Sequence, residues 1–158
     1  MTKTRRSPKK GVALRDAVHE FIRGFGLLAS DQTPCGHPLH LSEAHALLEL
    51  KARNESKMPA PTQRELGDHL KIDKSNVSRL CRRLETKGLI KCKPCADDGR
   101  SKRISLTAKG KRLASAVDAS SKTRFSALAA LLQSDNASVV RSLNELSAAI
   151  AQIAEDEC

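Results

Sequence analysis

Residues 62–106 read TQRELGDHLKIDKSNVSRLCRRLETKGLIKCKPCADDGRSKRISL and contain the clearest structural signals of the sequence. Thr62 followed three residues later by Glu65 is a capping box, which predicts the start of a short helix. Asp73 is the N-cap of a second helix, which we expect to run to Gly88, because glycine suits the left-handed C-terminal cap. Two short helices joined by about three residues predict a helix-turn-helix.

The sequence after this pair of helices predicts a β-hairpin and then two helices. The runs LIKCKP and KRISLT contain β-branched residues and are separated by CADDGRS, whose Asp-Asp-Gly is typical of a turn. A hairpin directly after a helix-turn-helix is a wing. Thr107 caps a long helix that Ser134, Asp135 and Asn136 interrupt. In the final helix the apolar residues are spaced as in a coiled-coil seam, which favours a partner helix: Val139, Leu143, Leu146, Ile150 and Ile153.

The N-terminal part of the chain predicts a basic arm, a helix, a loop and a second helix. Residues 1–10 carry five positive charges and no apolar cluster, so we expect a flexible arm. Residues 31–40, DQTPCGHPLH, contain two prolines and a glycine and predict a loop, and Ser42–Arg53 predicts a helix with leucines facing inward. The stripe of the first helix is formed by Leu14, Val18, Phe21, Ile22, Phe25 and Leu28.

The predicted fold is therefore mainly α with a small β-hairpin wing. A winged helix-turn-helix DNA-binding domain covers residues 41–106. A helical dimerisation region combines residues 11–40 and 107–158, and the arm covers residues 1–10.

Composition restricts the classes of function. The 158 residues carry 28 Lys and Arg against 18 Asp and Glu, a formal net charge of +10, which predicts a polyanionic partner. Aromatic residues make up only 2%, which disfavours proteins that stack RNA bases on rings. Duplex DNA remains, because its grooves and phosphates are bound by lysine and arginine. Apolar runs fall short of the roughly 18 to 20 residues that span a bilayer, so we expect a cytoplasmic protein.

The second helix of the pair has the composition of a recognition helix. At about 100° per residue, an apolar face of Val77, Leu80, Cys81 and Leu84 lies opposite a polar face that can read base edges or bind phosphates. The alternative is a merely solvated polar face. We expect the DNA-binding residues to be Thr62, Lys74, Ser75, Asn76, Ser78, Arg79, Arg82, Arg100 and Lys102.

Positive charge gathers where a duplex would lie. Residues 79–112 contain twelve Lys and Arg and three acidic residues, a net charge of +9. Arg100 at the wing tip has the reach to enter a minor groove, and Asp98 could orient it. The alternative for this pair is an exposed ion pair of little consequence.

The runs SRLCRRLETKGLIKC and DDGRSKRISLTAKGKRL resemble the winged helix-turn-helix of MarR-type bacterial transcriptional regulators, with their D-x-R wing and L-T-x-x-G strand-to-helix junction. The motif match covers residues 41–113. The resemblance implies a homodimer paired through the first and last two helices, with each recognition helix in a major groove. It also implies a repressor of pseudo-palindromic operators that a small molecule, an oxidant or a metal releases. By the same resemblance, Ser75, Asn76 and Arg79 contact bases and phosphates, and Arg100 is the wing arginine.

The loop and the start of the next helix hold a candidate metal site. Cys35, His37, His40 and His45 place one thiol and three imidazoles within eleven residues, a set that suits Zn or Cu(I). Glu43 or Glu49 could supply a further ligand. The alternatives are a rigid turn with an accidental cluster and a thiol sensor at Cys35.

Two cysteines flank the end of the first wing strand in the motif C-K-P-C. Cys92 and Cys95 form a candidate redox switch or soft-metal site, and we expect Lys91 and Lys93 to favour the thiolate. A catalytic dithiol is not expected, since no helix N-terminus or βαβ unit accompanies the motif. Cys81 is expected to be a small buried core residue.

The sequence as a whole predicts a sequence-specific, dimeric DNA-binding regulator with a small-molecule, metal or thiol-reactive effector. The alternative is a non-specific architectural nucleic-acid-binding protein, whose affinity would not depend on sequence. An enzyme is not expected, because neither a nucleophile with its base nor a glycine-rich phosphate loop occurs.

Overall fold

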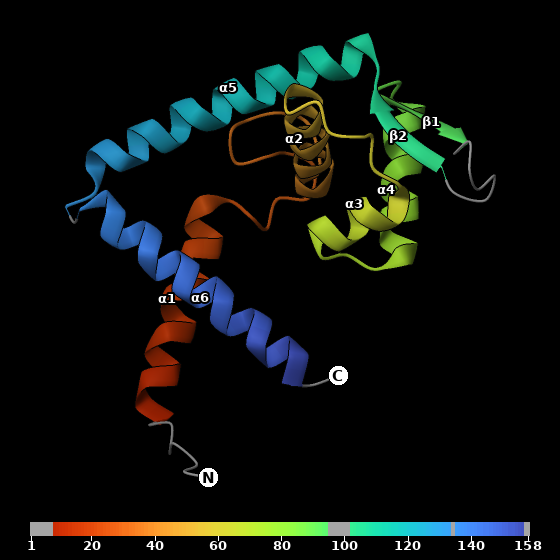
Figure 1. The fold of residues 1–158 in the computed structure, drawn as a ribbon. Helices are drawn as coiled ribbons and strands as arrows, with labels where there is room; N and C mark the ends of the chain where they lie inside the picture. The colour runs from red at the N-terminus through yellow and green to blue at the C-terminus, as the bar shows by residue number, and fades with distance from the viewer. Residues whose placement is uncertain (1–7, 95–101, 134, 157–158) are drawn as a thin grey trace. The chain divides into compact units, whose positions relative to one another are not determined.

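The computed structural model describes residues 8–94, 102–133 and 135–156, which form six helices and two strands (Figure 1). The chain divides into two compact units, residues 1–119 and 120–158, and the fifth helix continues from the first unit into the second. The elements are α1 (Pro8–Phe25), α2 (Leu41–Glu55), α3 (Gln63–Leu70), α4 (Lys74–Thr86), β1 (Ile90–Pro94), β2 (Lys102–Leu106), α5 (Ala108–Leu131) and α6 (Asn136–Asp156).

This order confirms the predicted fold class, a mainly helical protein with a two-stranded hairpin after a helix-turn-helix. None of the described helices combines the length and the apolar character needed to cross a membrane.

The core of the first unit is aliphatic and lies between α2, α3, α4 and the hairpin. Side chains from all of these elements are fully buried, and no aromatic side chain is among them. The largest are Leu47, Leu66, Leu80, Leu84, Leu89 and Ile104. Each buried leucine stabilises the fold by about 1.5–3 kcal/mol relative to an exposed position. Helices packed on helices therefore supply the platform on which α4 rests.

The hairpin pairs β1 with β2 in antiparallel register, with Ile90 opposite Leu106 and Cys92 opposite Ile104. The segment before α3 extends this sheet, because the Ile104 N–H donates to the Pro61 carbonyl oxygen at 2.8 Å. The root of the hairpin is thus fixed to the start of the helix-turn-helix.

A glycine allows α5 to begin directly against the hairpin. The Thr107 hydroxyl accepts from the Gly110 N–H at 3.0 Å and donates to the Gly88 carbonyl oxygen at 2.7 Å, which confirms Thr107 as the cap. A Cβ at position 110 would lie 1.9 Å from the Leu89 carbonyl oxygen. Only glycine fits this junction without movement.

The first helix differs from the prediction at its ends. α1 begins at Pro8, so residues 8–10, which we assigned to the arm, are helical, and residues 1–7 lie outside the described part of the chain. Proline is favoured at the first helical position because its ring already has helical φ and it has no N–H to satisfy. The helix ends at Phe25, since Gly26 has φ +82°, so Leu28, which we predicted as the last residue of the apolar stripe, lies beyond the helix.

In the second unit α6 has an exposed apolar stripe. Asp135 accepts from the Ser138 N–H at 3.2 Å, which accounts for the predicted interruption before α6. Leu143, Ile150 and Ile153, three of the five residues of the predicted seam, are exposed. The partner helix that this seam favours stays a prediction.

Candidate nucleic-acid interface

The α4 helix has two faces of opposite character, as the sequence predicts. Val77, Leu80, Cys81 and Leu84 are buried with exposed fractions of 2% or less, which fixes the rotation of the helix about its axis. The polar residues predicted for DNA binding are exposed: Lys74, Ser75, Asn76, Ser78, Arg79 and Arg82. The packing thus presents hydroxyl, amide and guanidinium groups on one accessible side.

The N-terminal turn of α4 is organised by Asp73. Its carboxylate accepts from the Asn76 N–H at 2.8 Å, from the Asn76 side-chain amide at 2.6 Å and from the Ser75 hydroxyl at 2.7 Å. These hydrogen bonds, led by that from Ser75, lower the pKa of Asp73 to about 2. The sequence identified Asp73 only as a backbone cap. The structure shows that it also fixes the side chains of Ser75 and Asn76, two of the predicted base-reading residues.

An open hollow of about 810 Å³ lies between α3, α4 and the start of β2. Thr62, Lys74, Ser78 and Lys102 line it, so four of the predicted DNA-binding residues meet around one concave surface. Thr62 itself is half-buried, and its hydroxyl accepts from the Glu65 N–H at 3.2 Å, which confirms the capping box.

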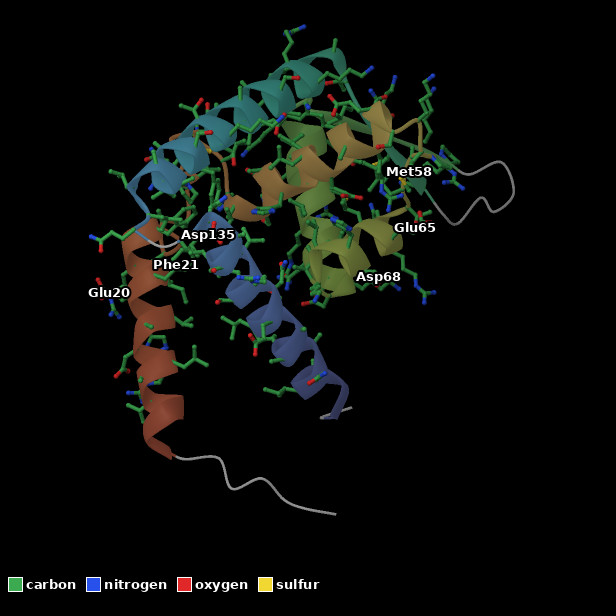
Figure 2. The ribbon with its side chains drawn as sticks, turned by 60° about the vertical axis from the view of Figure 1, so that its left-hand side comes forward. Glu20, Phe21, Met58, Glu65, Asp68 and Asp135 are labelled. Atoms are coloured by element: carbon green, nitrogen blue, oxygen red, sulfur yellow. The ribbon has the colours of Figure 1, made fainter. Side chains whose placement is uncertain are left out.

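The first turn of α3 adds two residues that we did not predict. Gln63 and Arg64 also line the hollow, and the Arg64 side chain is 91% exposed. Figure 2 shows Glu65 and Asp68 on the same helix, and both are exposed. Their position in the sequence could have indicated this role, because the helix before a recognition helix brings its first turn to the same surface.

The cations of residues 79–112 divide into two groups. Four of them bind the protein itself. Arg83 and Lys87 contact Glu43, the Arg103 guanidinium donates to the Ala60 carbonyl oxygen at 2.7 Å, and the Lys109 ammonium donates to the Lys87 carbonyl oxygen at 2.8 Å.

The remaining described cations of this stretch are exposed and free of side-chain ion pairs within the described residues. They are Arg79, Arg82, Lys91, Lys93, Lys102, Lys111 and Arg112. Three of them, Lys91, Lys93 and Lys111, line a second hollow of about 380 Å³ beside β2. The predicted concentration of positive charge thus lies on α4, the hairpin and the start of α5. Arg100 and Asp98 lie outside the described residues, and their wing-tip roles stay predictions.

The loop before α2 does not form a metal cluster. Within the described ranges, no three His, Cys, Asp or Glu side chains are grouped so that they could hold a metal ion. The Thr33 hydroxyl lies 3.3 Å from the Cys35 sulfur and accepts from the His37 N–H at 3.0 Å, while His40 is the N-cap of α2 and His45 is exposed.

The two glutamates considered as further ligands have other partners. Glu49 pairs with Arg53 at 2.6 Å and with His69 at 2.9 Å, and Glu43 binds cations of α4. The binding of a metal by Cys35, His37, His40 and His45 stays a prediction, and in the described part of the chain these side chains are not grouped as ligands.

The prediction for Cys92 is wrong in one respect. Burial, together with a hydrogen bond to Glu85, raises the pKa of Cys92 to about 12, so its neutral thiol is favoured. Lys91 and Lys93 do not stabilise the thiolate, because side chains alternate along a strand and these lysines lie on the opposite face from Cys92. Cys95 lies outside the described residues. Cys81 is fully buried with a pKa raised to about 11 by burial, which confirms it as a core residue.

Comparison with known proteins agrees with this geometry. Residues 37–101 match the sequence pattern of the MarR family. The chain is similar to S. aureus MepR in complex with DNA (TM-score 0.65, 24% identity, 89% of this chain and 97% of that chain). It is also similar to a probable transcriptional regulator from Pseudomonas aeruginosa, with a TM-score of 0.65 and 26% identity over 86% of this chain and 95% of that chain.

The chain is similar to a third solved structure, that of MarR, with a TM-score of 0.59 and 21% identity over 100% of each chain. No curated protein matches the chain. The matched residues include α3, α4 and β1, the elements that build the exposed surface. Residues 37–101 therefore carry the sequence pattern of the MarR family, and the chain has the fold of solved MarR-type transcriptional regulators.

Proposed function

We propose that this protein is a dimeric, sequence-specific DNA-binding repressor that an effector releases from its operator. The observation that carries the proposal is the surface of α4. Its polar side chains are exposed while its apolar face is fixed in the core, and four predicted contact residues surround one hollow. Such a helix fits a major groove, where arginine, asparagine and serine side chains read base edges.

Charge supports duplex DNA as the partner. The exposed cations of α4, the hairpin and the start of α5 suit phosphates on either side of a groove. Most base contacts are expected from the N-terminal half of α4, where Asp73 holds Ser75 and Asn76 in place. A side chain that is ordered before binding loses less conformational entropy on contact with a base, which favours specific binding.

The exposed apolar side chains support a homodimer. In the first unit Leu14 and Phe21 of α1 are each 53% exposed, and in the second unit Leu143 and Ile150 of α6 are 53% and 57% exposed. An amphipathic helix gains most of its stability by burying its apolar stripe. The heptad-like spacing on α6 suits a helix of a second copy, and two copies would place two α4 helices on half-sites about 34 Å apart. Sedimentation should give twice the mass of the chain, and a monomer at micromolar concentration would contradict this part of the proposal.

The effector belongs to one of three classes: a small molecule, a metal ion, or a thiol-reactive compound acting at Cys35. The dispersed arrangement of Cys35, His37, His40 and His45 favours the first class over the second. Adding zinc or Cu(I) to the chelator-treated complex, with a Cys35→Ser variant alongside, separates these classes. Release that depends on metal and is lost in the variant would identify the loop as the sensor.

Arg79→Ala is the variant that tests sequence-specific binding. Arg79 is exposed on the polar face of α4, and loss of one arginine-to-base contact costs about 1–3 kcal/mol. We expect the affinity for an operator duplex to fall about 5-fold to 150-fold, with a much smaller loss on a scrambled duplex. Lys122→Ala in α5 is the control, because it removes the same charge outside α4 and the hairpin. Equal losses by Arg79→Ala on the two duplexes would favour the alternative, a non-specific architectural protein.

A further inference from the structure

Glu43, in the first turn of α2, is a fully buried carboxylate that contacts the far end of α4. Its exposed fraction is 0%. Its Oε2 accepts from the Lys87 ammonium at 2.7 Å and from the His40 N–H at 3.1 Å, and its Oε1 accepts from the Arg83 Nε–H at 3.3 Å. One buried side chain therefore joins the start of α2 to two cations that are 40 and 44 residues away in sequence.

A buried charge is expensive unless it is paired, and Glu43 is paired three times. Burial alone raises the pKa of Glu43. The hydrogen bonds from Lys87 and from the His40 backbone outweigh that effect and lower the pKa below its usual value. The side chain is thus a carboxylate at neutral pH. An apolar residue of similar size could fill the same space without needing partners, so the fold does not require these ion pairs for its stability. Their role is better explained by the position in which they hold α4.

The contacts of Glu43 lie at the end of α4 opposite to the predicted base-reading residues. Lys87 is the C-cap of α4, and its carbonyl oxygen accepts from the Lys109 ammonium of α5 at 2.8 Å. The C-terminal end of α4 is therefore held from α2 and from α5. The apolar face of α4 is packed in the core and these polar contacts attach its C-terminal end to α2 and α5, while Ser75 and Asn76 lie at its N-terminal end.

We propose that Glu43 is a positioning residue for DNA reading, whose contacts with Arg83 and Lys87 hold α4 at the angle that fits the groove. This inference rests on the proposed function. Groove reading depends on side-chain placement to within about 0.5 Å, whereas non-specific binding depends mainly on charge. The two kinds of binding should therefore respond differently when the carboxylate is lost.

Glu43→Gln tests the proposal against Glu55→Gln as control. Both variants remove one negative charge from α2, but Glu55 pairs with Lys51 of the same helix and its side chain is 61% exposed. Dissociation constants are measured on an operator duplex and on a scrambled duplex, at a temperature where thermal melts show both variants folded.

We expect Glu43→Gln to weaken operator binding at least tenfold. Binding to the scrambled duplex should be unchanged or up to about threefold tighter, because Arg83 and Lys87 are released. The control should leave the ratio of the two constants within twofold of wild type. Loss of folded protein would weaken binding to both duplexes equally, and a purely electrostatic role would strengthen both.

Lys87→Gln provides a second route to the same contact if Glu43→Gln does not fold. It removes the closest partner of Glu43 at a side chain that is 40% exposed, and we expect the same fall in the ratio. If the wild-type protein prefers the operator and the folded Glu43→Gln or Lys87→Gln variant shows the same preference, Glu43 is not a positioning residue. The proposed function would stand in that case. A wild-type protein that shows no preference would overturn both this inference and the proposed function.

Discussion

Gly110→Ala places a methyl group in the tightest junction of the fold. Gly110 lies in the first turn of α5, where an added Cβ would lie 1.9 Å from the Leu89 carbonyl oxygen and 2.9 Å from its carbonyl carbon. Separations below 3.0 Å essentially never occur for a real Cβ, so α5 and the start of the hairpin must move apart by about 1 Å. Both neighbouring atoms are backbone, so no side-chain rotation relieves the contact.

The expected loss of stability is about 1–3 kcal/mol. Overpacking of this kind costs about 1–3 kcal/mol. The Leu89 carbonyl oxygen accepts hydrogen bonds from the Thr107 N–H at 3.0 Å and from the Thr107 hydroxyl at 3.2 Å, and the displacement strains both. Loss of one such hydrogen bond costs about 1 kcal/mol. Against these losses, alanine is favoured over glycine inside a helix by up to about 1 kcal/mol. For a chain of this length, the balance lowers Tm by about 3–10 °C.

Gly24→Ala is the matched control, and thermal unfolding followed by circular dichroism at one protein concentration is the assay. Gly24 is also helical, and nothing lies within 4 Å of its added Cβ. The same substitution should there raise stability by about 0.4–1 kcal/mol. A Gly110→Ala variant as stable as wild type, or one that shifts Tm in the same direction as Gly24→Ala, would show that the junction tolerates a methyl group.

Three further predictions follow from caps and thiols. Thr62→Ala should lower the free energy of unfolding by about 1 kcal/mol, measured by urea denaturation, because the α3 cap is lost; Thr62→Ser, which keeps the hydroxyl, should restore most of it. The folded-state pKa of Asp73 is about 2, below its unfolded value, so its stabilising contribution is complete above about pH 4 and is lost as pH falls toward 2; Asp73→Asn should flatten the fall in stability over that range. Iodoacetamide at pH 7 should leave Cys81 and Cys92 unmodified in the folded protein, since both thiols have raised pKa values, and rapid alkylation of Cys92 detected by peptide mass analysis would contradict its assigned environment.

The sequence predicts those features that depend on neighbouring residues. The capping box from Thr62 to Glu65, the buried face of α4 and the cap at Thr107 arise from hydrogen bonds or periodicity within a few positions, and the structure contains all three. The start of α1 at Pro8 was also available from the preference of proline for a first helical position.

Features that depend on distant or face-specific contacts were missed. The two cationic partners of Glu43 lie 40 and 44 residues beyond it, and nothing local marks that carboxylate as buried. The high pKa of Cys92 follows from strand alternation, which places the adjacent lysines on the other face and leaves burial and Glu85 to act on the thiol. The loop of Cys35 shows why proximity in sequence is insufficient for a metal site, because ligands must also converge in space.

Sequence-specific recognition is tested by the affinity of the reduced wild-type protein for DNA upstream of its own gene, compared with a scrambled duplex of equal length and composition. Fluorescence anisotropy at physiological salt would give both dissociation constants. A preference of at least about 10³ for the upstream duplex is the predicted result. Equal affinities with the same steep salt dependence on both duplexes would contradict sequence-specific regulation and would indicate an architectural DNA-binding protein.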